Sequence, residues 1–444
     1  MIKKIIIIFL LFISTKIFSL DPEELYNTMF NLFVTENGNN VNDNSGINSF
    51  LTLYIPPGGK YEGMGTAFTG VSDNIGFFNA NPSVSSRLNL SEVSFFVNNF
   101  IEDVSMQTIA FTGRSKDLGF GFQGKWLHVG FTGVNDWAER SSKGIYSEFI
   151  LKNNISYNFL RGFDFSGISI GSNLNLAYRS LPSSIYPKID VQDQSALALF
   201  FDLGAISEFN FLKFYSARER NLSVGLSLMN IGREFIDGPD PLPSSVNLGF
   251  EYSPIESLTV SYDLAYKFNL HEPNILDSFT WKLTPGEGVY HAIGLDYRVV
   301  DFASIHGGFL YKIGNPRLTL GTEISFQKNP GENVKIERDL KELMNKYIFI
   351  FNYSLDLNPA LNRFSIEMKL NLGDYNRLAN RENVQNLYIK GLQQFSNGYI
   401  EEAIKIWENC IKLDKTFDPA IRMKLLAEQS IILQKKIKDN QIIK

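Results

Sequence analysis

The sequence predicts an all-β transmembrane barrel of fourteen antiparallel strands, with an N-terminal plug and a small C-terminal α-helical extension. Three observations predict this fold class. The chain opens with a secretory signal, long segments after Glu92 alternate apolar and polar residues, and aromatic residues make up 14% of the 444 residues. A tilted strand needs about nine to eleven residues to cross a bilayer, whereas strands of soluble proteins average about five or six. Together these features favour an outer-membrane barrel over a soluble sandwich.

Residues 1–20 read as a cleaved signal peptide. Lys3 and Lys4 form its basic start, an unbroken apolar run extends from Ile5 to Ile13, and the small Ser19 suits the last position before cleavage. The alternative is a transmembrane anchor, but the run is too short to cross about 30 Å of hydrocarbon as a helix. We therefore expect a protein exported from the cytoplasm.

Residues 21–91 are predicted to form a short helix, a linker and a plug, also called a hatch. Apolar residues at helical spacing predict the helix over 22–34, and the Asn-rich stretch 37–48 has the composition of a linker. The Gly-rich stretch from Gly58 to Val84 is nearly free of charge. A periplasmic linker is the alternative, but the apolar residues of this stretch favour a plug.

Residues 92–372 are predicted to form the barrel. The clearest strand runs from Arg363 to Leu372, where Phe364, Ile366 and Met368 face one way and charged or polar residues face the other. A membrane barrel turns such an apolar face to lipid and tolerates charge in its lumen. The predicted strands are 92–100, 104–114, 118–134, 145–158, 168–180, 196–211, 222–230, 245–253, 258–269, 289–298, 303–312, 317–328, 346–355 and 363–372.

An even number of strands places both ends of the barrel on one side of the membrane. In bacterial outer-membrane barrels the short turns lie in the periplasm and the long loops outside. The predicted turns 115–117, 254–257 and 299–302 are short, as this orientation requires, while 329–345 is long and charged and could form a short helix from Val334. We expect the bacterial outer membrane as the location, with both termini in the periplasm.

The sequence offers no catalytic constellation, cofactor motif or metal motif, so an enzyme is not expected. His291 and His306 fall in neighbouring predicted strands and could approach each other, although a structural role is favoured. The glycines of Gly119-Phe120-Gly121 lie inside a predicted strand and suggest a bend or bulge rather than phosphate binding. A net charge of −5 supplies no basic field for nucleic acid.

The glycine-rich stretch resembles the start of the FadL family of outer-membrane transporters. The resemblance rests on Ala67-Phe68, on Val71-Ser72-Asp73-Asn74 and on Asn79-Ala80-Asn81-Pro82 ahead of the first strand. It covers roughly residues 58–372, and the GMGTAFT-type opening is similar to that of an uncharacterised spirochaetal branch of the superfamily. Ser83 stands where the family usually has Ala after Asn-Pro.

The resemblance implies a fourteen-stranded barrel whose N-terminal segment folds inside as a hatch. It also implies passive uptake of hydrophobic small molecules, chiefly long-chain fatty acids, after a local rearrangement around Asn79 to Pro82. Glycines suit a segment that lies close to the barrel wall, and a proline stiffens the approach to the first strand. The residues expected along the hatch and substrate path are Gly63, Gly65, Phe68, Phe77, Phe78, Asn79, Asn81 and Pro82.

The extension at 373–444 is helical by its spacing and resembles a tetratricopeptide repeat. Gly391, Ala403 and Trp407 fall at positions of that motif and are expected to form a partner-binding tail, while Lys415 departs from its expected proline. A final helix is expected over about 419–438. One repeat is fewer than the three that usually stand alone, so a plain helical hairpin is an equal alternative.

Two other functions remain open beside transport. Some FadL-like barrels resemble scaffolds or shuttles of secretion and surface-assembly complexes, and a repeat-type tail suits such a role because it binds partners. A general porin is the third reading, which a plug disfavours. The expected partners are a hydrophobic ligand, outer-membrane lipid and a periplasmic or envelope protein.

Overall fold

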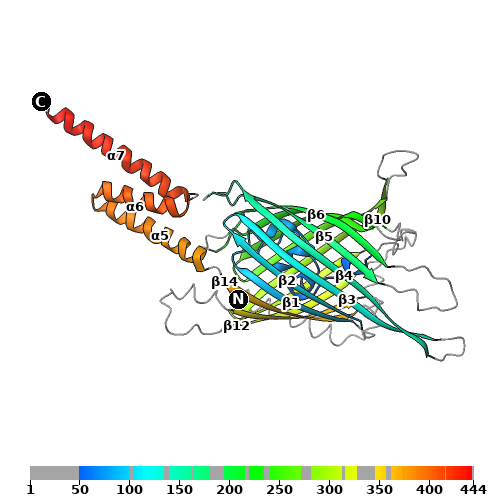
Figure 1. Cartoon of the computed structure of the whole chain (residues 1–444). Helices are drawn as coiled ribbons and strands as arrows, with labels where there is room; N and C mark the ends of the chain where they lie inside the picture. The colour runs from blue at the N-terminus through cyan, green and yellow to red at the C-terminus, as the bar shows by residue number, and fades with distance from the viewer. Residues whose placement is uncertain are drawn as a thin grey trace.

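The computed structural model describes residues 50–100, 104–134, 140–162, 165–180, 195–215, 220–234, 241–271, 282–312, 316–327, 346–356, 362–373, 375–415 and 417–442. Fourteen antiparallel strands form a closed barrel in which each strand pairs with its neighbours in the chain and β1 pairs with β14 (Figure 1). The predicted fold class is therefore confirmed. The strands are β1 (Ser91–Phe100), β2 (Ser105–Ser115), β3 (Leu118–Val134), β4 (Arg140–Phe159), β5 (Ile168–Ser180), β6 (Ala196–Phe209), β7 (Leu222–Glu234), β8 (Pro243–Ile255), β9 (Leu258–His271), β10 (Lys282–Val300), β11 (Ala303–Lys312), β12 (Arg317–Gln327), β13 (Lys346–Asp356) and β14 (Arg363–Gly373).

The alternation seen in the sequence separates the two faces of the barrel wall. In β1, Phe95 and Val97 point outward and are each 40% exposed, while Ser94, Phe96 and Asn98 point inward and are buried. Large apolar side chains are exposed in the same way on the other strands, from Ile109 on β2 to Phe364 on β14. An apolar outer face is what lipid contact requires of a barrel.

Three strand predictions were short by four residues or more at the end of the barrel opposite the start of β1. β4 begins at Arg140 instead of residue 145, β7 ends at Glu234 instead of residue 230, and β10 begins at Lys282 instead of residue 289. The β3–β4 and β9–β10 hairpins extend beyond the barrel as two-stranded ribbons (Figure 1). Pro285 and the glycines near it interrupt the alternating pattern at the start of β10, so the sequence did not predict this part of the strand. The pairing with β9 shifts register there, between Pro285 and Gly288.

Residues 50–90, which we call the plug, fill the interior of the barrel (Figure 1). The plug contains three 3₁₀ helices, η1 (Leu51–Leu53), η2 (Ile75–Asn79) and η3 (Pro82–Ser86), and one short α-helix, α3 (Gly59–Gly63). Asn74 and Asn81 cap η2 and η3, since each side chain accepts a hydrogen bond from a backbone N–H two residues further on. These short elements turn the chain within a narrow space.

Three helices follow the barrel: α5 (Tyr375–Ser396), α6 (Ile400–Leu413) and α7 (Asp418–Ile442). They leave the end of β14 and lie beyond that rim of the barrel (Figure 1). Their shared core contains Val384, Ala403, Trp407, Cys410 and Ala427. Among the described residues no helix combines the length and the hydropathy needed to cross a membrane.

Several predicted segments lie outside the described residues: the signal peptide 1–20, the helix 22–34, the linker 37–48 and the charged stretch 329–345. In the tail, the first helix begins at Tyr375, earlier than the helical spacing from Asn383 suggested. The last helix covers the expected 419–438 and continues to Ile442.

Candidate functional site: the plug and the vestibule

Two lysines of the barrel wall bind carbonyl groups of the plug. The Lys125 ammonium donates to the carbonyls of Thr52 and Ile55, both at 3.1 Å, and the Lys152 ammonium donates to the carbonyl of Phe78 at 3.1 Å. The plug has little regular secondary structure, so its buried backbone groups need partners from elsewhere. An unsatisfied buried group costs about 1–3 kcal/mol, and the lysines remove that cost.

Two carboxylates add to this attachment. The Asp263 carboxylate on β9 accepts hydrogen bonds from the backbone N–H groups of Phe68 and Thr69, both at 2.8 Å. In α3, the Glu62 carboxylate forms a buried ion pair with Arg363 of β14. Removing one partner of a buried pair is costly because it leaves an uncompensated charge. The plug is thus bound to opposite parts of the wall.

Glycines of the wall let the plug backbone approach directly. A Cβ atom at Gly308 would lie 2.0 Å from the backbone nitrogen of Gly65, and one at Gly225 would lie 2.0 Å from the carbonyl oxygen of Thr69. We call the six inward glycines of this kind the glycine belt. They are Gly119, Gly171, Gly225, Gly249, Gly294 and Gly308, on β3, β5, β7, β8, β10 and β11.

The glycine belt corrects one prediction. Gly119 and Gly121 were expected to allow a bend or bulge in their strand, but β3 pairs with β2 and β4 in unbroken register there. Added Cβ atoms would meet the plug instead, at 2.2 Å from the backbone of Ser85 and Ser86 and at 2.7 Å from Phe78. Close approach of another segment is the second reason for glycine within a strand.

The residues expected along the hatch path begin in and after α3. A Cβ atom at Gly63 would lie 2.1 Å from the His306 ring, so this position has no room for a side chain. Gly65 adopts a positive φ of 63°, which favours glycine, and lies against the backbone of β11. Phe68 is fully buried and contacts the Tyr61 ring edge to face, with centroids 5.4 Å apart.

The remaining hatch residues surround η2 and η3. The Phe77 and Phe78 rings stack at 4.3 Å within a buried apolar cluster that also contains Phe96 of β1 and Ile206 of β6. Asn79 accepts a hydrogen bond from the Lys125 ammonium at 3.3 Å through its side-chain oxygen. The structure therefore places these side chains in contact with the wall.

Asn81 connects several parts of the plug. Its side-chain amide donates to the carbonyl of Thr69 at 2.9 Å and to the carbonyl of Ala205 on β6 at 3.1 Å, and its oxygen accepts from the Ser83 hydroxyl at 2.6 Å. Pro82 occupies the first turn of η3, and its carbonyl accepts from the Asn154 side chain at 2.8 Å. Asn81-Pro82 is thus a firmly bound point of the plug.

The three residues expected in a partner-binding tail lie in the core of the helical extension. Trp407 and Ala403 of α6 are fully buried. A Cβ atom at Gly391 of α5 would lie 2.3 Å from the Trp407 indole nitrogen, so glycine is required for the helices to pack. In this structure the three residues join α5 to α6, and the exposed apolar residues of the tail lie elsewhere, mainly on α7.

His291 and His306 do not meet. The pairing of β10 with β11 places His291 opposite Tyr311 and His306 opposite Asp296, five residues further along β10. His291 hydrogen-bonds with Tyr262 at 2.8 Å, and His306 with Asn352 at 2.6 Å. Each ring therefore has its own hydrogen-bond partner, as expected for the structural role that the sequence analysis favoured over a metal-binding pair.

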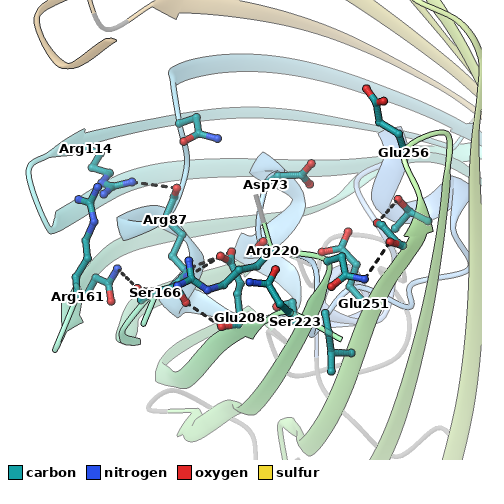
Figure 2. Close-up of a pocket in the computed structure, with 18 of the residues that line it drawn as sticks. Asp73, Arg87, Arg114, Arg161, Ser166, Glu208, Arg220, Ser223, Glu251 and Glu256 are labelled. Carbon is teal, nitrogen blue, oxygen red and sulfur yellow. Dashed lines mark hydrogen bonds and ion pairs between the residues drawn. The ribbon is translucent and has the colours of Figure 1, made fainter. Parts of the chain in front are cut away.

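A cavity of about 1630 Å³ lies below the plug, at the end of the barrel where β1 begins and β14 ends (Figure 2). We call it the vestibule. Its wall consists of strand ends and turns, with residues 412–415 and Phe417 from the link between α6 and α7 on one side. The lining is dominated by charged and polar side chains, among them Arg87, Arg114, Arg161, Glu208, Glu251 and Glu256 (Figure 2).

Several lysine and arginine side chains that line the vestibule form ion pairs with carboxylates of the barrel. The Arg87 guanidinium binds the Glu208 carboxylate at 2.6 Å, and Arg161 binds Asp117 at 3.0 Å. Lys60, at the start of α3, binds the Asp296 carboxylate at 2.8 Å. Burial lowers the pKa of Lys60, but the carboxylates of Asp296, Asp73 and Glu323 outweigh that effect and raise it above the usual value. The ammonium is therefore charged.

The sequence reasoning missed the side chains that bind the plug. Lys125, Lys152 and Asp202 are buried, and the Asp202 carboxylate accepts from Lys152 at 3.2 Å. A charge at an inward position of a predicted strand was a readable signal for the lumen. The plug group that each charge binds could not be predicted, because the partners are far apart in the sequence: Lys125 and Thr52 are separated by 73 positions.

The fold and site define a class: a closed fourteen-stranded barrel with an apolar outer face and an N-terminal plug bound to its inner wall. Residues 34–332 match the sequence profile of a family described as "Uncharacterised protein family (UPF0164)". The chain belongs to this family.

Relatives described as UPF0164 proteins occur in Treponema pallidum (strain Nichols). One is 25% identical over 389 residues, which covers 84% of this chain and 82% of the relative. A second is 24% identical over 388 residues, with 83% and 72% coverage. The family match at residues 34–332 covers the plug and strands β1 to β12, in keeping with the spirochaetal resemblance of the opening stretch.

Two solved structures of outer-membrane proteins align with this chain. A Pseudomonas aeruginosa FadL homologue aligns over 70% of this chain and 97% of its own, with a TM-score of 0.42 and 10% identity. The Pseudomonas putida toluene transporter TodX aligns over 68% and 95%, with a TM-score of 0.39 and 11% identity.

Proposed function

We propose that this protein is an outer-membrane channel in which the plug gates passive uptake of hydrophobic small molecules such as long-chain fatty acids. The observation that carries the proposal is a closed barrel with an apolar outer face whose lumen is filled by the plug. Such an outer face suits a bilayer, and a filled lumen requires movement before anything passes. The hydrophobic substrate class rests on the FadL-type residues Asn79-Ala80-Asn81-Pro82.

The interior favours one path for such a molecule. The vestibule is lined by charges and offers little to an apolar ligand. The Phe77–Phe78 pair instead packs on Phe96 of β1, Ala110 of β2 and Ile206 of β6 in a fully buried apolar cluster. A shift of η2 would open this apolar surface, which is suited to a hydrocarbon chain.

The gating step would be a local rearrangement around Asn79 to Pro82. Asn81 contacts both the plug and β6, so its hydrogen bonds would break in this step. Each neutral hydrogen bond contributes about 0.5–1.5 kcal/mol net, and a ligand that fills the apolar cluster could offset that loss. The same hydrogen bonds would restore the closed plug after passage.

Uptake in cells tests this function. A strain lacking the protein should accumulate radiolabelled oleate several-fold more slowly than the parent, and the wild-type gene should restore uptake. A variant with the plug bound by an engineered disulfide should not restore it. Unchanged oleate uptake in the deletion strain would count against a fatty-acid transporter.

A second candidate function is a scaffold or shuttle barrel of a secretion or surface-assembly complex. The observation in its favour is the exposed apolar surface of α7, where Leu425, Leu426, Ile432, Leu433 and Ile437 are at least half exposed. Recovery of a stable envelope protein with the full chain, lost when Ile432 and Leu433 are replaced by Ser, would favour this function. We also propose that the tail faces the periplasm, an orientation that suits both candidate functions.

A further inference from the structure

We propose that the vestibule binds small organic cations that carry primary ammonium groups, at the carboxylates gathered around Lys60. Four carboxylates take part: Asp73 of the plug, Glu251 of β8, Asp296 of β10 and Glu323 of β12. This site goes beyond the proposed gating and does not depend on it, because it lies in the vestibule and needs no movement of the plug. Charge balance, one unpartnered buried hydroxyl and the size of the cavity favour such a ligand.

The charge balance favours a cation. Lys60 binds Asp296 directly at 2.8 Å and lies close enough to Asp73, Glu251 and Glu323 for electrostatic interaction. Lys369 of β14 also interacts electrostatically with Asp73 and Glu323, so two ammonium groups face the four carboxylates. Asp73 and Glu251 also repel each other across the cavity edge (Figure 2). A bound cation would relieve this repulsion, which is stronger in a partly enclosed site than in water.

Two arginines of the vestibule bind carboxylates outside the group of four. Arg87 binds Glu208 through two nitrogens, at 2.6 Å and 3.1 Å, and donates to the carbonyl of Ser166. Arg298 binds Glu256 at the exposed rim. Arg220 also lines the vestibule and interacts electrostatically with Glu208.

Ser223 provides the second observation. It lies on β7 directly between Glu208 of β6 and Glu251 of β8, and it lines the vestibule (Figure 2). Ser223 is only 4% exposed, yet its hydroxyl oxygen has no hydrogen-bond partner among the described residues. Buried polar groups normally have partners. An ammonium group beside Glu251 would donate to this oxygen, and directly paired positions on neighbouring strands suit a shared ligand.

An organic ammonium fits better than a metal ion. Within the described part of the chain, no three His, Cys, Asp or Glu side chains are grouped closely enough to hold a metal. Carboxylates that are spread over three strands and the plug instead suit a ligand with separated charges. The cavity of about 1630 Å³ leaves room for an extended diamine.

Calorimetric titration of the detergent-solubilised full chain with 1,5-diaminopentane tests the site at low ionic strength. We expect saturable binding, tighter than that of n-pentylamine, and no binding of n-pentanol. Glu251→Gln and Ser223→Ala should each weaken diamine binding about tenfold, since a hydrogen bond to a charged group changes affinity by roughly tenfold or more. The matched control is Glu256→Gln, which removes a rim carboxylate of the same cavity and should change the Kd less than twofold.

Three outcomes would overturn the proposal. They are the absence of saturable diamine binding, equal weakening by Glu256→Gln and Glu251→Gln, and full displacement of the diamine by an equal concentration of Mg²⁺. Retained β-sheet circular dichroism and heat-modifiable gel migration establish that each variant is folded. If Glu251→Gln does not fold, the order of affinities among diamine, monoamine and alcohol for the wild-type chain decides the question.

Discussion

Single residues of the inner wall meet the plug in two ways. Charged side chains such as Lys125 and Asp263 bind its backbone groups, and the glycine belt lets that backbone approach the strands directly. The first kind provides hydrogen bonds that the irregular plug cannot make internally. The glycine belt provides close packing between plug and wall, and dispersion attraction stabilises such contacts only at short distance.

The glycine belt predicts a position-specific loss of plug packing. Gly308→Ala would place a methyl group 2.0 Å from the backbone nitrogen of Gly65, whereas Gly307→Ala, one residue away, would meet its nearest neighbour at 3.5 Å. Overpacking of this kind costs about 1–3 kcal/mol. We expect trypsin to cleave after Lys60 several-fold faster in Gly308→Ala than in wild type. Equal protection of the plug in both variants would contradict the role assigned to the belt.

Asp263 predicts a leak. Asp263→Ala leaves the N–H groups of Phe68 and Thr69 without their acceptor, at a cost of about 1–3 kcal/mol each. The plug should open more often, so liposomes that contain this variant should swell faster in a small sugar than wild-type liposomes. Glu256→Ala, at the exposed rim, is the control and should swell at the wild-type rate. A wild-type rate for Asp263→Ala would show that this carboxylate does not restrain the plug.

At the scale of elements, the tail is a packed unit of its own. The Trp407 indole donates a hydrogen bond to the carbonyl of Tyr388 at 3.3 Å and packs against Gly391. The core of α5, α6 and α7 contains no barrel residue. The stability of the tail should therefore respond to its own core and leave the barrel unchanged.

Trp407→Ala tests this independence. Removing a fully buried Trp costs about 3–5 kcal/mol, which should unfold the tail. We expect the helical circular dichroism signal at 222 nm to fall while the heat-modifiable migration of the barrel stays at the wild-type temperature. Leu413→Ala, at a 47% exposed position, serves as the control with little change expected. A lower barrel transition in Trp407→Ala would show that the two units are coupled.

The elements of the barrel were predictable because alternation is a local signal. Arg363 to Leu372 shows both faces of β14 without knowledge of any neighbour. The start of β10 was not predictable, because Pro285 and Gly288 interrupt the pattern in a ribbon beyond the barrel. The glycine belt did leave a signal, since Gly225 alternates with Ser223 and Ser227 on the inward face. The plug residues that contact those glycines could not be predicted, because they lie far away in the sequence.

At the scale of the whole molecule, the plug and the tail meet at the vestibule, because residues of both line it. The plug fills the lumen, and the tail extends beyond the rim where β14 ends (Figure 1). The resemblance of Asn79 to Pro82 to a family of transporters pointed to the plug from local residues alone. The polar vestibule could not be predicted, because it forms only where the strand ends, the plug and residues 412–415 come together.

If the plug must move before a ligand passes, a disulfide that joins the plug to the wall will block transport. The hydroxyls of Ser85 in η3 and Ser156 in β4 lie 2.7 Å apart, so cysteines at both positions suit a disulfide. Ser253 and Thr259, whose hydroxyls lie 2.8 Å apart in the β8–β9 hairpin, give a matched control within the wall.

The measurement is oleate uptake by cells that carry Ser85→Cys/Ser156→Cys, before and after reduction. We predict that oxidation reduces uptake at least tenfold and that dithiothreitol restores it, while Ser253→Cys/Thr259→Cys transports at the wild-type rate in both states. Wild-type uptake with the Ser85–Ser156 disulfide fully formed would contradict the account, because passage would then occur with the plug bound in place.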